Sequence, residues 1–232
     1  GNPNCGKTAL FNLLTGARQK VANYAGVTVE RKVGTATLRN GTHVSVVDLP
    51  GAYSLNPATP DEQITLEVIE GRRAGEDAPD AIVAVVDATN LRMNLRLVLE
   101  LRRLGRPMLV ALNMADVARS QGLAIDVAAL SRELGCPVVE TVAVRRNGHA
   151  GLLAQIEAQM GAAKALAAPA GPAHDSAELQ REVRRVLAIA APGAPRVQRF
   201  RHRIDAVVLH PVAGLAILAV LLFLVFQAVF SW

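Results

Sequence analysis

The chain has 232 residues, which is enough for one domain with additional elements or for two small domains. Apolar residues make up 51% of it and charged residues 19%, which are the values of a globular protein shifted towards membrane proteins. Two isolated cysteines, Cys5 and Cys136, exclude a disulfide framework and a zinc-binding pattern, and they indicate a reducing, cytosolic setting.

The net charge is +5, and the basic excess is local. Residues 181–203 contain seven arginines and only one acidic residue, Glu182. Such a segment can contact nucleic acid or anionic lipid, so the residues that follow it must decide between these two partners.

The first eight residues read GNPNCGKT and match the phosphate-binding loop G-x-x-x-x-G-K-[ST]. Glycine lets the backbone N–H groups approach phosphate oxygens, Lys7 supplies a positive charge for the β- and γ-phosphates, and Thr8 supplies a hydroxyl for Mg²⁺. A helix over residues 9–14 is expected to direct its N-terminus at the anion. The nucleotide contacts predicted in this stretch are Gly1, Asn2, Pro3, Asn4, Cys5, Gly6, Lys7, Thr8 and Ala9.

In folds of this class the phosphate-binding loop follows a strand inside the sheet. No residue precedes Gly1 in this sequence. We therefore expect a fragment whose sheet lacks its first strand, and neighbouring strands with unpaired backbone groups.

Residues 15–30 are polar and small and predict a loop. Strands are expected at 29–38 and 44–47, joined by the turn Arg39-Asn40-Gly41-Thr42. The second strand runs into Asp48, Leu49, Pro50 and Gly51, the pattern DxxG. An acidic residue followed by glycine at a strand end places a carboxylate near Mg²⁺ and an amide near the γ-phosphate.

Further along, the pattern predicts a helix at 61–72, a buried strand at 81–86, an amphipathic helix at 93–104 and a buried strand at 108–112. The last strand ends in Asn113, Met114, Ala115 and Asp116. An ionised Asp116 accepts hydrogen bonds from the N1–H and N2–H₂ groups of guanine, which adenine does not offer. The alternative is an ordinary strand-to-helix turn with an aspartate cap.

A helix at 127–134, a strand at 137–142 and a helix at 152–160 complete the first predicted domain, residues 1–160. Thr141, Val142 and Ala143 stand where a backbone amide would meet the guanine O6. Alternating strands and helices predict an α/β fold of the P-loop GTPase type with a mostly parallel sheet.

The second predicted region, residues 161–203, combines an Ala/Gly/Pro linker with a short helical segment capped by Asp175. The third, residues 204–232, contains an apolar run at 206–230 that would extend roughly 37 Å as a helix and could cross a bilayer. The arginines just before it place the preceding domain in the cytoplasm and predict contact with membrane lipid. The same arginines therefore need no nucleic-acid partner to explain them.

The chain resembles one family, the bacterial ferrous-iron transporters called FeoB. The resemblance rests on GNPNCGKT and on NMAD, together with four longer stretches: GVTVE at 26–30, DLPGAYSLNPATPDE at 48–62, VVDATNLRMNL at 85–95 and RIDAVVLHPVAGL at 203–215. These motifs span nearly the whole chain, and the last two are more specific to one family than the motifs shared by all small GTPases.

The resemblance implies GTP hydrolysis coupled to Fe²⁺ uptake across the bacterial inner membrane, with GTP and GDP as ligands. It adds Gly26, Val27 and Thr28 to the nucleotide site. Thr28 would reach Mg²⁺ together with Thr8 and Asp48, and Asn4 would help to hold K⁺ beside the phosphates. The implied catalytic residues are Lys7, Thr28, Gly51 and Asn4. A homo-oligomer stays open, and the iron pathway would lie in membrane segments outside this sequence.

One departure from other GTPases concerns the residue after DxxG, where classical small GTPases carry a water-positioning glutamine. Ala52 stands there. Hydrolysis is therefore expected to be slow and stimulated by K⁺. The helical region is also shorter than is usual in the family, which leaves its control of nucleotide release open.

Two other functions remain to be separated from this one. A ribosome- or tRNA-associated regulatory GTPase would use the basic segment to bind RNA. A non-catalytic GTP/GDP sensor would bind nucleotide without releasing phosphate.

Overall fold

The computed structural model describes residues 1–16, 19–24, 27–144, 148–162, 176–192 and 211–230. They fall in two compact units, residues 1–192 and 193–232, and each unit is considered by itself. Gly26, Asp175 and most of the predicted linker, residues 163–175, lie outside the described residues. The predicted domain boundaries at 160 and 203 stay predictions.

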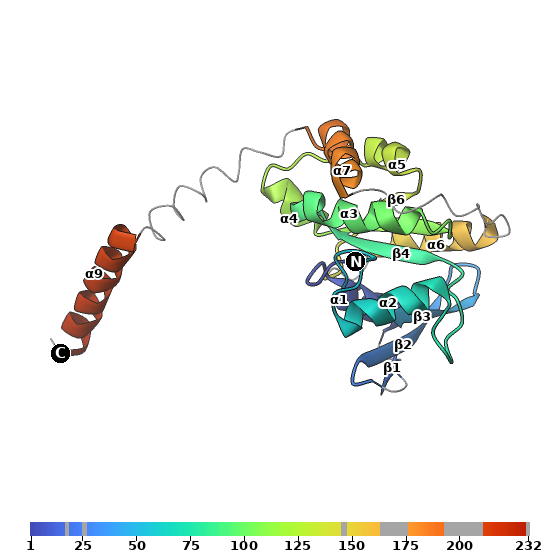
Figure 1. The fold of residues 1–232 in the computed structure, drawn as a ribbon, viewed down its shortest axis with the longest axis horizontal. Helices are drawn as coiled ribbons and strands as arrows, with labels where there is room; N and C mark the ends of the chain where they lie inside the picture. Colours follow the sequence, from blue (N-terminus) through green and yellow to red (C-terminus); the bar gives the residue numbers. More distant parts are fainter. Residues whose placement is uncertain (17–18, 25–26, 145–147, 163–175, 193–210, 231–232) are drawn as a thin grey trace. The chain divides into compact units, whose positions relative to one another are not determined.

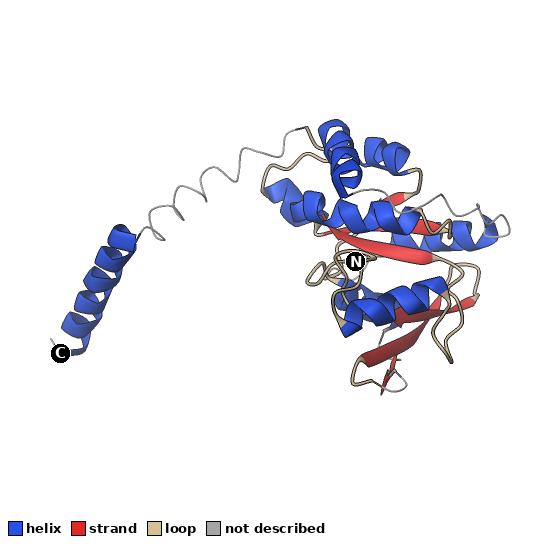
Figure 2. Ribbon diagram, in the orientation of Figure 1, coloured by secondary structure: helices blue, strands red, loops and turns tan. Residues whose placement is uncertain are grey.

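Two three-stranded sheets form the centre of the first unit (Figures 1 and 2). One contains β1 (Gln19–Asn23), β2 (Glu30–Thr37) and β3 (His43–Asp48), which are antiparallel. The other contains β4 (Ile82–Asp87), β5 (Met108–Asn113) and β6 (Val138–Glu140), which are parallel. The strands predicted at 29–38, 44–47, 81–86 and 108–112 are thus confirmed, and the strand predicted at 137–142 is shorter, because β6 covers only Val138–Glu140.

The helices of this unit surround both sheets. They are α1 (Lys7–Thr15), α2 (Pro60–Glu70), the short 3₁₀ helix η1 (Ala88–Asn90), α3 (Leu91–Arg102), α4 (Ala115–Ser120), α5 (Val127–Leu134), α6 (Ala150–Ala162) and α7 (Ser176–Ala190). All six helices predicted in this unit are confirmed within a few residues. The short α4, directly after Asn113 and Met114, was not predicted.

Alternate residues of the parallel strands serve two separate cores, as the two-residue period of a strand requires. Ala84, Val86 and Leu112 pack towards α3, α5 and α7. Val85, Leu109 and Ala111 pack towards α1 and α6. Because both faces are covered, β5 is buried along its whole length, and its carboxyl end with Asn113 is fixed rigidly.

Two expectations about the first sheet need correction. Residues 15–30 are not all loop, because Gln19–Asn23 forms β1 and pairs with β2 from Gln19 opposite Gly34 to Asn23 opposite Glu30. The sequence QKVAN is polar and lacks a clear alternation, so its pairing partner rather than its own pattern makes it a strand. The sheet is also not one mostly parallel sheet, since only β4, β5 and β6 are parallel.

In the described part of the chain, β3 is hydrogen-bonded only to β2, and β4 only to β5. A cavity of about 550 Å³ lies between them and is lined by residues of both strands and of the helices on either face. No described strand joins β3 to β4.

The second unit contains α9 (Pro211–Phe230), whose side chains are almost all apolar. Among the helices that the structure describes, none is both long and apolar enough to cross a membrane. The span predicted at 204–232 is therefore not confirmed.

Candidate functional site

The phosphate-binding loop, Gly1–Gly6, leads directly into α1 at Lys7. Gly6 adopts a positive φ of 86°, and a Cβ there would lie 2.2 Å from Asn113 Nδ2. A Cβ on Gly1 would lie 2.2 Å from the carbonyl oxygen of Val85 in β4. The two glycines are thus required by the protein's own packing, in addition to the predicted approach of phosphate.

Two side chains mark the interior and the tip of this loop. Lys7 Nζ donates to the carbonyl oxygen of Asn2 at 2.9 Å, so the ammonium group lies across the loop. Asn4 is exposed and has a φ of 62°, which asparagine tolerates better than most residues. Its amide is therefore presented at the surface of the loop.

Thr8 and Asp48, 40 residues apart in the sequence, are in direct contact. Thr8 Oγ1 donates to Asp48 Oδ2 at 2.9 Å. Thr8 comes from the first turn of α1, and Asp48 from the carboxyl end of β3. A hydroxyl and a carboxylate oxygen side by side are ligands that suit Mg²⁺. The structure thus fits the predicted Mg²⁺ site at these two residues.

The DLPG segment lies against the phosphate-binding loop. The Ala52 backbone N–H donates to the Gly1 carbonyl oxygen at 3.2 Å. A Cβ on Gly51 would lie 2.8 Å from Pro3 Cγ, so only glycine fits this approach. The Ala52 side chain is buried, with 1% of its surface exposed.

The predicted base-binding residues also come together. Asn113 is buried, and its Nδ2 donates to the Cys5 carbonyl oxygen at 3.0 Å. Its Oδ1 accepts from the Ala143 backbone N–H at 3.1 Å and from Thr141 Oγ1 at 3.5 Å. Met114 has a φ of 59° and immediately precedes α4, whose first turn carries Asp116. Asn113 thus ties the phosphate-binding loop to residues 141–143.

A known family has the same sequence pattern. The pattern described as ferrous iron transport protein B matches residues 1–156, more than half of the chain. The chain belongs to this family. The Fe(2+) transporters FeoB of Salmonella typhimurium and Escherichia coli K12 are 53% and 50% identical to it over 152 residues. The match covers 64% of this chain and 19% of each transporter, so the chain spans about a fifth of the relatives' length.

Solved FeoB structures have the same fold. An S. thermophilus NFeoB E67A mutant bound to GDP matches 76% of this chain and 64% of its own, with a TM-score of 0.64 and 41% identity. The cytosolic domain of T. maritima FeoB in GMPPNP form matches 77% of this chain and 68% of its own, with a TM-score of 0.64 and 35% identity. The chain therefore has the P-loop GTPase fold of FeoB G domains, and the ribosomal alternative is not favoured.

Thr28 is the predicted FeoB site residue that the structure does not bring to the others. It is exposed and lies in the connection between β1 and β2. Among the described residues it makes no hydrogen bond to Thr8 or Asp48. Val27 beside it is half-buried. Val142 is placed by its own N–H, which donates to the Gly148 carbonyl oxygen at 3.4 Å.

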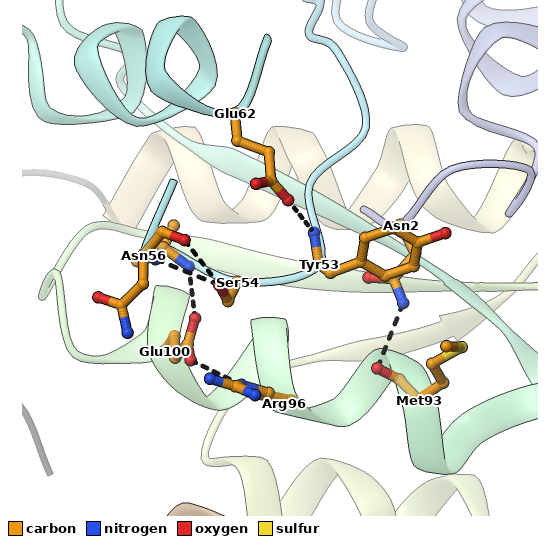
Figure 3. Close-up of polar contacts among 9 residues, drawn as sticks. Asn2, Tyr53, Ser54, Asn56, Glu62, Met93, Arg96 and Glu100 are labelled. Carbon is orange, nitrogen blue, oxygen red and sulfur yellow. Dashed lines mark hydrogen bonds and ion pairs between the residues drawn. The ribbon is translucent and has the colours of Figure 1, made fainter. Parts of the chain in front are cut away.

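Two carboxylates that hold the loop after DLPG were not predicted (Figure 3). Glu62 accepts from the backbone N–H groups of Tyr53 at 3.1 Å and Ala58 at 2.9 Å, and these donors lower the pKa of its carboxyl group. Glu100 of α3 accepts from the Leu55 N–H at 2.5 Å and pairs with Arg96 at 3.1 Å.

The sequence carried a signal for only one of these two carboxylates. Thr59 and Glu62 have the spacing of a capping box, and Thr59 Oγ1 accepts from the Glu62 N–H at 3.3 Å. Glu100 lies in an amphipathic helix, where a glutamate predicts a solvated face and not a contact with a distant loop.

Proposed function

We propose that this chain binds GTP with Mg²⁺ and hydrolyses it, as the nucleotide-dependent part of a ferrous-iron transporter of the bacterial inner membrane. The contact between Thr8 and Asp48 carries the proposal, because it joins two motifs distant in sequence at one point in the fold. The FeoB relatives bound to GDP or in GMPPNP form support the choice of nucleotide.

The residues divide the work of binding. Lys7 and the backbone of the phosphate-binding loop hold the phosphates, and Asp116 reads the guanine, with residues 141–143 beside it. Thr8, Asp48 and Thr28 would hold Mg²⁺, which neutralises charge on the phosphates when it is bound. The Gly51 amide faces the γ-phosphate.

Asn4 is proposed to help hold a K⁺ ion. Its exposed amide at the tip of the loop supports this role, since an amide oxygen is a suitable ligand for a hard cation. A bound K⁺ would supply the positive charge that an arginine supplies in other GTPases. The need for it follows from Ala52, whose buried methyl group cannot orient water.

Phosphate release from GTP with Mg²⁺, in KCl and in NaCl at equal ionic strength, tests the proposal. We expect slow turnover that is about ten-fold faster in KCl, and loss of this difference in Asn4→Ala. Asn40→Ala, an asparagine in the turn between β2 and β3, is the matched control and should keep the difference. Equal rates in the two salts would remove Asn4 from the cation site. Tight binding without phosphate release in either salt would identify a sensor.

Membrane attachment through residues 204–232 is part of the same proposal. The absence of polar side chains from 212 to 226 supports it, as do the exposed apolar side chains of α9, such as Leu215 and Phe223. The full chain should float with liposomes of neutral lipid, to which the arginines of 181–203 are not attracted, and a chain ending at residue 203 should not. Flotation of neither chain would contradict the proposal.

Fe²⁺ as cargo is tested by iron uptake through a whole transporter in which the residue corresponding to Lys7 is alanine, and we expect uptake to be lost.

A further inference from the structure

The segment that carries Thr28 is the loop of a β-hairpin. Residues 24–29 connect β1 and β2, and two backbone hydrogen bonds shape the connection. The Tyr24 N–H donates to the Val29 carbonyl oxygen at 3.0 Å, and the Val27 N–H donates to the Tyr24 carbonyl oxygen at 3.2 Å. Whatever fixes this hairpin therefore also fixes the position of Thr28.

Tyr24 anchors one end of the loop. Only 2% of its surface is exposed, and its ring forms a core cluster with Ile64 and Val68 of α2. Leu49 of the DLPG segment packs against the same cluster. The Tyr24 hydroxyl is buried and has no hydrogen-bond partner in the part of the chain that the structure describes. Packing of the ring, and not its hydroxyl, therefore provides the attachment.

Arg31, the second residue of β2, anchors the other end of the loop. It forms a two-pronged ion pair with Glu76, in which Nη2 donates to Oε2 at 2.9 Å and Nε donates to Oε1. The Glu76 side chain is only 12% exposed, so water screens the pair weakly. The Arg73 guanidinium lies 5.9 Å from the centre of the Tyr24 ring. Both anchors of the hairpin thus end on α2 and the segment just after it.

We infer that Tyr24 and Arg31 are positioning residues that hold the two ends of the hairpin loop on α2 and on the segment just after it. Thr28 lies between these two ends, so the anchors limit how far it can lie from the γ-phosphate and its Mg²⁺ when they are bound. The inference rests on the proposed function, and it adds two residues to which no role in the site has been given. Since Leu49 belongs to the same cluster, the hairpin and the DLPG segment are held on one common support.

The expected effect follows from population arithmetic. If only a fraction of molecules hold the two ends of the loop in place, the apparent affinity for a ligand that needs Thr28 falls by that fraction. GDP has no γ-phosphate and needs Thr28 less. Loosening the hairpin should therefore weaken binding of a triphosphate more than binding of GDP, whereas a general loss of structure would weaken both.

The test measures the affinities of a fluorescent non-hydrolysable GTP analogue and of fluorescent GDP, both with Mg²⁺, on the full chain. Tyr24→Ala and Arg31→Ala should each weaken the analogue about ten-fold and change GDP less than about two-fold. Tyr24→Phe should bind both nucleotides with wild-type affinity, because it keeps the ring. Arg72→Ala is the matched control, since Arg72 is an exposed arginine of the same segment that pairs with Glu70.

Thr28→Ala separates the inference from the function on which it rests. If Thr28→Ala weakens the analogue but Tyr24→Ala and Arg31→Ala do not, the positioning role is wrong and the proposed function stands. If Thr28→Ala has no effect, the assignment of Thr28 itself fails and the inference fails with it. Equal weakening of both nucleotides by the two anchor variants would also overturn it. If Tyr24→Ala does not fold, Glu76→Gln provides the same comparison, because it removes one charge of the Arg31–Glu76 ion pair.

Discussion

Asn113 and Asp116 belong to one four-residue motif but act through different contacts. Asn113 uses both ends of its amide inside the protein, donating to Cys5 and accepting from Ala143. It therefore joins the loop that holds phosphate to the segment proposed to meet the base. Asp116 is partly exposed at the start of α4, where it can meet a ligand. Base recognition should depend on Asp116, and Asn113 should affect phosphate and base binding together.

Replacing Asp116 with asparagine tests base recognition directly. Asparagine exchanges one acceptor oxygen for an NH₂ donor, so it no longer matches the two donors of guanine but matches the carbonyl of xanthine. Asp116→Asn should weaken GTP binding about 100-fold, or about 3 kcal/mol, and gain binding of xanthosine triphosphate. Competition binding with the two nucleotides measures the change. Glu140→Gln on β6 is a control that should alter neither affinity, and full GTP affinity in Asp116→Asn would exclude this residue from base recognition.

At the level of single residues, the sequence predicted which side chains lie together better than it predicted the contacts that hold them there. The phosphate-binding loop, Asp48 and Asn113 were predicted from spacing alone, because these motifs are local. The clash that a Cβ on Gly6 would make with Asn113 could not be predicted, since it joins positions more than 100 residues apart. The same holds for the contact of Glu100 with the Leu55 backbone.

Among the elements, α2 connects the loop after DLPG to the hairpin that carries Thr28. Its N-terminus is capped by Thr59, and Glu62 in its first turn holds the loop after DLPG. Its next turns carry Ile64 and Val68, on which Tyr24 packs. The sequence predicted this helix, at 61–72, but not its contacts with the loop after DLPG and with the hairpin. Those attachments depend on tertiary contacts that no local pattern records.

The lowered pKa of Glu62 makes the stability that its carboxylate contributes depend on pH. Backbone N–H donors, first Ala58 and then Tyr53, lower the pKa below its unfolded value. A carboxyl group with a lowered pKa stabilises the fold above the unfolded pKa, and this contribution is lost as the pH falls through the folded pKa. Wild type should therefore exceed Glu62→Gln in unfolding free energy by about 1–2 kcal/mol at pH 7, and the difference should shrink as the pH falls below the ordinary pKa of glutamate, about 4.3.

Denaturant unfolding of the two proteins between pH 3 and pH 7 measures this difference. Glu30→Gln is the matched control, because the Glu30 side chain is 63% exposed and should give a small difference at every pH. A Glu62→Gln curve parallel to that of wild type would show that the N–H donors do not stabilise the carboxylate.

For the first unit as a whole, the division into two sheets is the feature that sequence reasoning predicted only partly. The sequence predicted one mostly parallel sheet, whereas β3 and β4 have no common partner among the described strands. The antiparallel arrangement of β1, β2 and β3 was not predicted beyond its hairpin, because β1 is polar and its pairing is non-local. The valines of β3 remain only half-buried, as expected for a strand with one free edge beside a cavity.

The cavity predicts how the stability of the whole unit can be changed. Gly1 lines it, together with apolar side chains that include Leu10, Val68 and Ile156. A chain lengthened before Gly1 by six alternating valines and isoleucines should place a strand between β3 and β4. That strand would bury apolar side chains on both faces and pair with both free edges, at the cost of ordering six residues. We expect a gain of about 2 kcal/mol or more, seen as a rise of about 4–8 °C in the thermal midpoint.

An extension of six glycines and serines has the same length but cannot bury apolar surface, so it should leave the midpoint unchanged. Equal midpoints for the two extensions would mean that the strand edges facing the cavity do not accept a strand. If the apolar extension tightens GTP binding and the polar extension does not, then a strand that fills the cavity also stabilises the phosphate-binding loop.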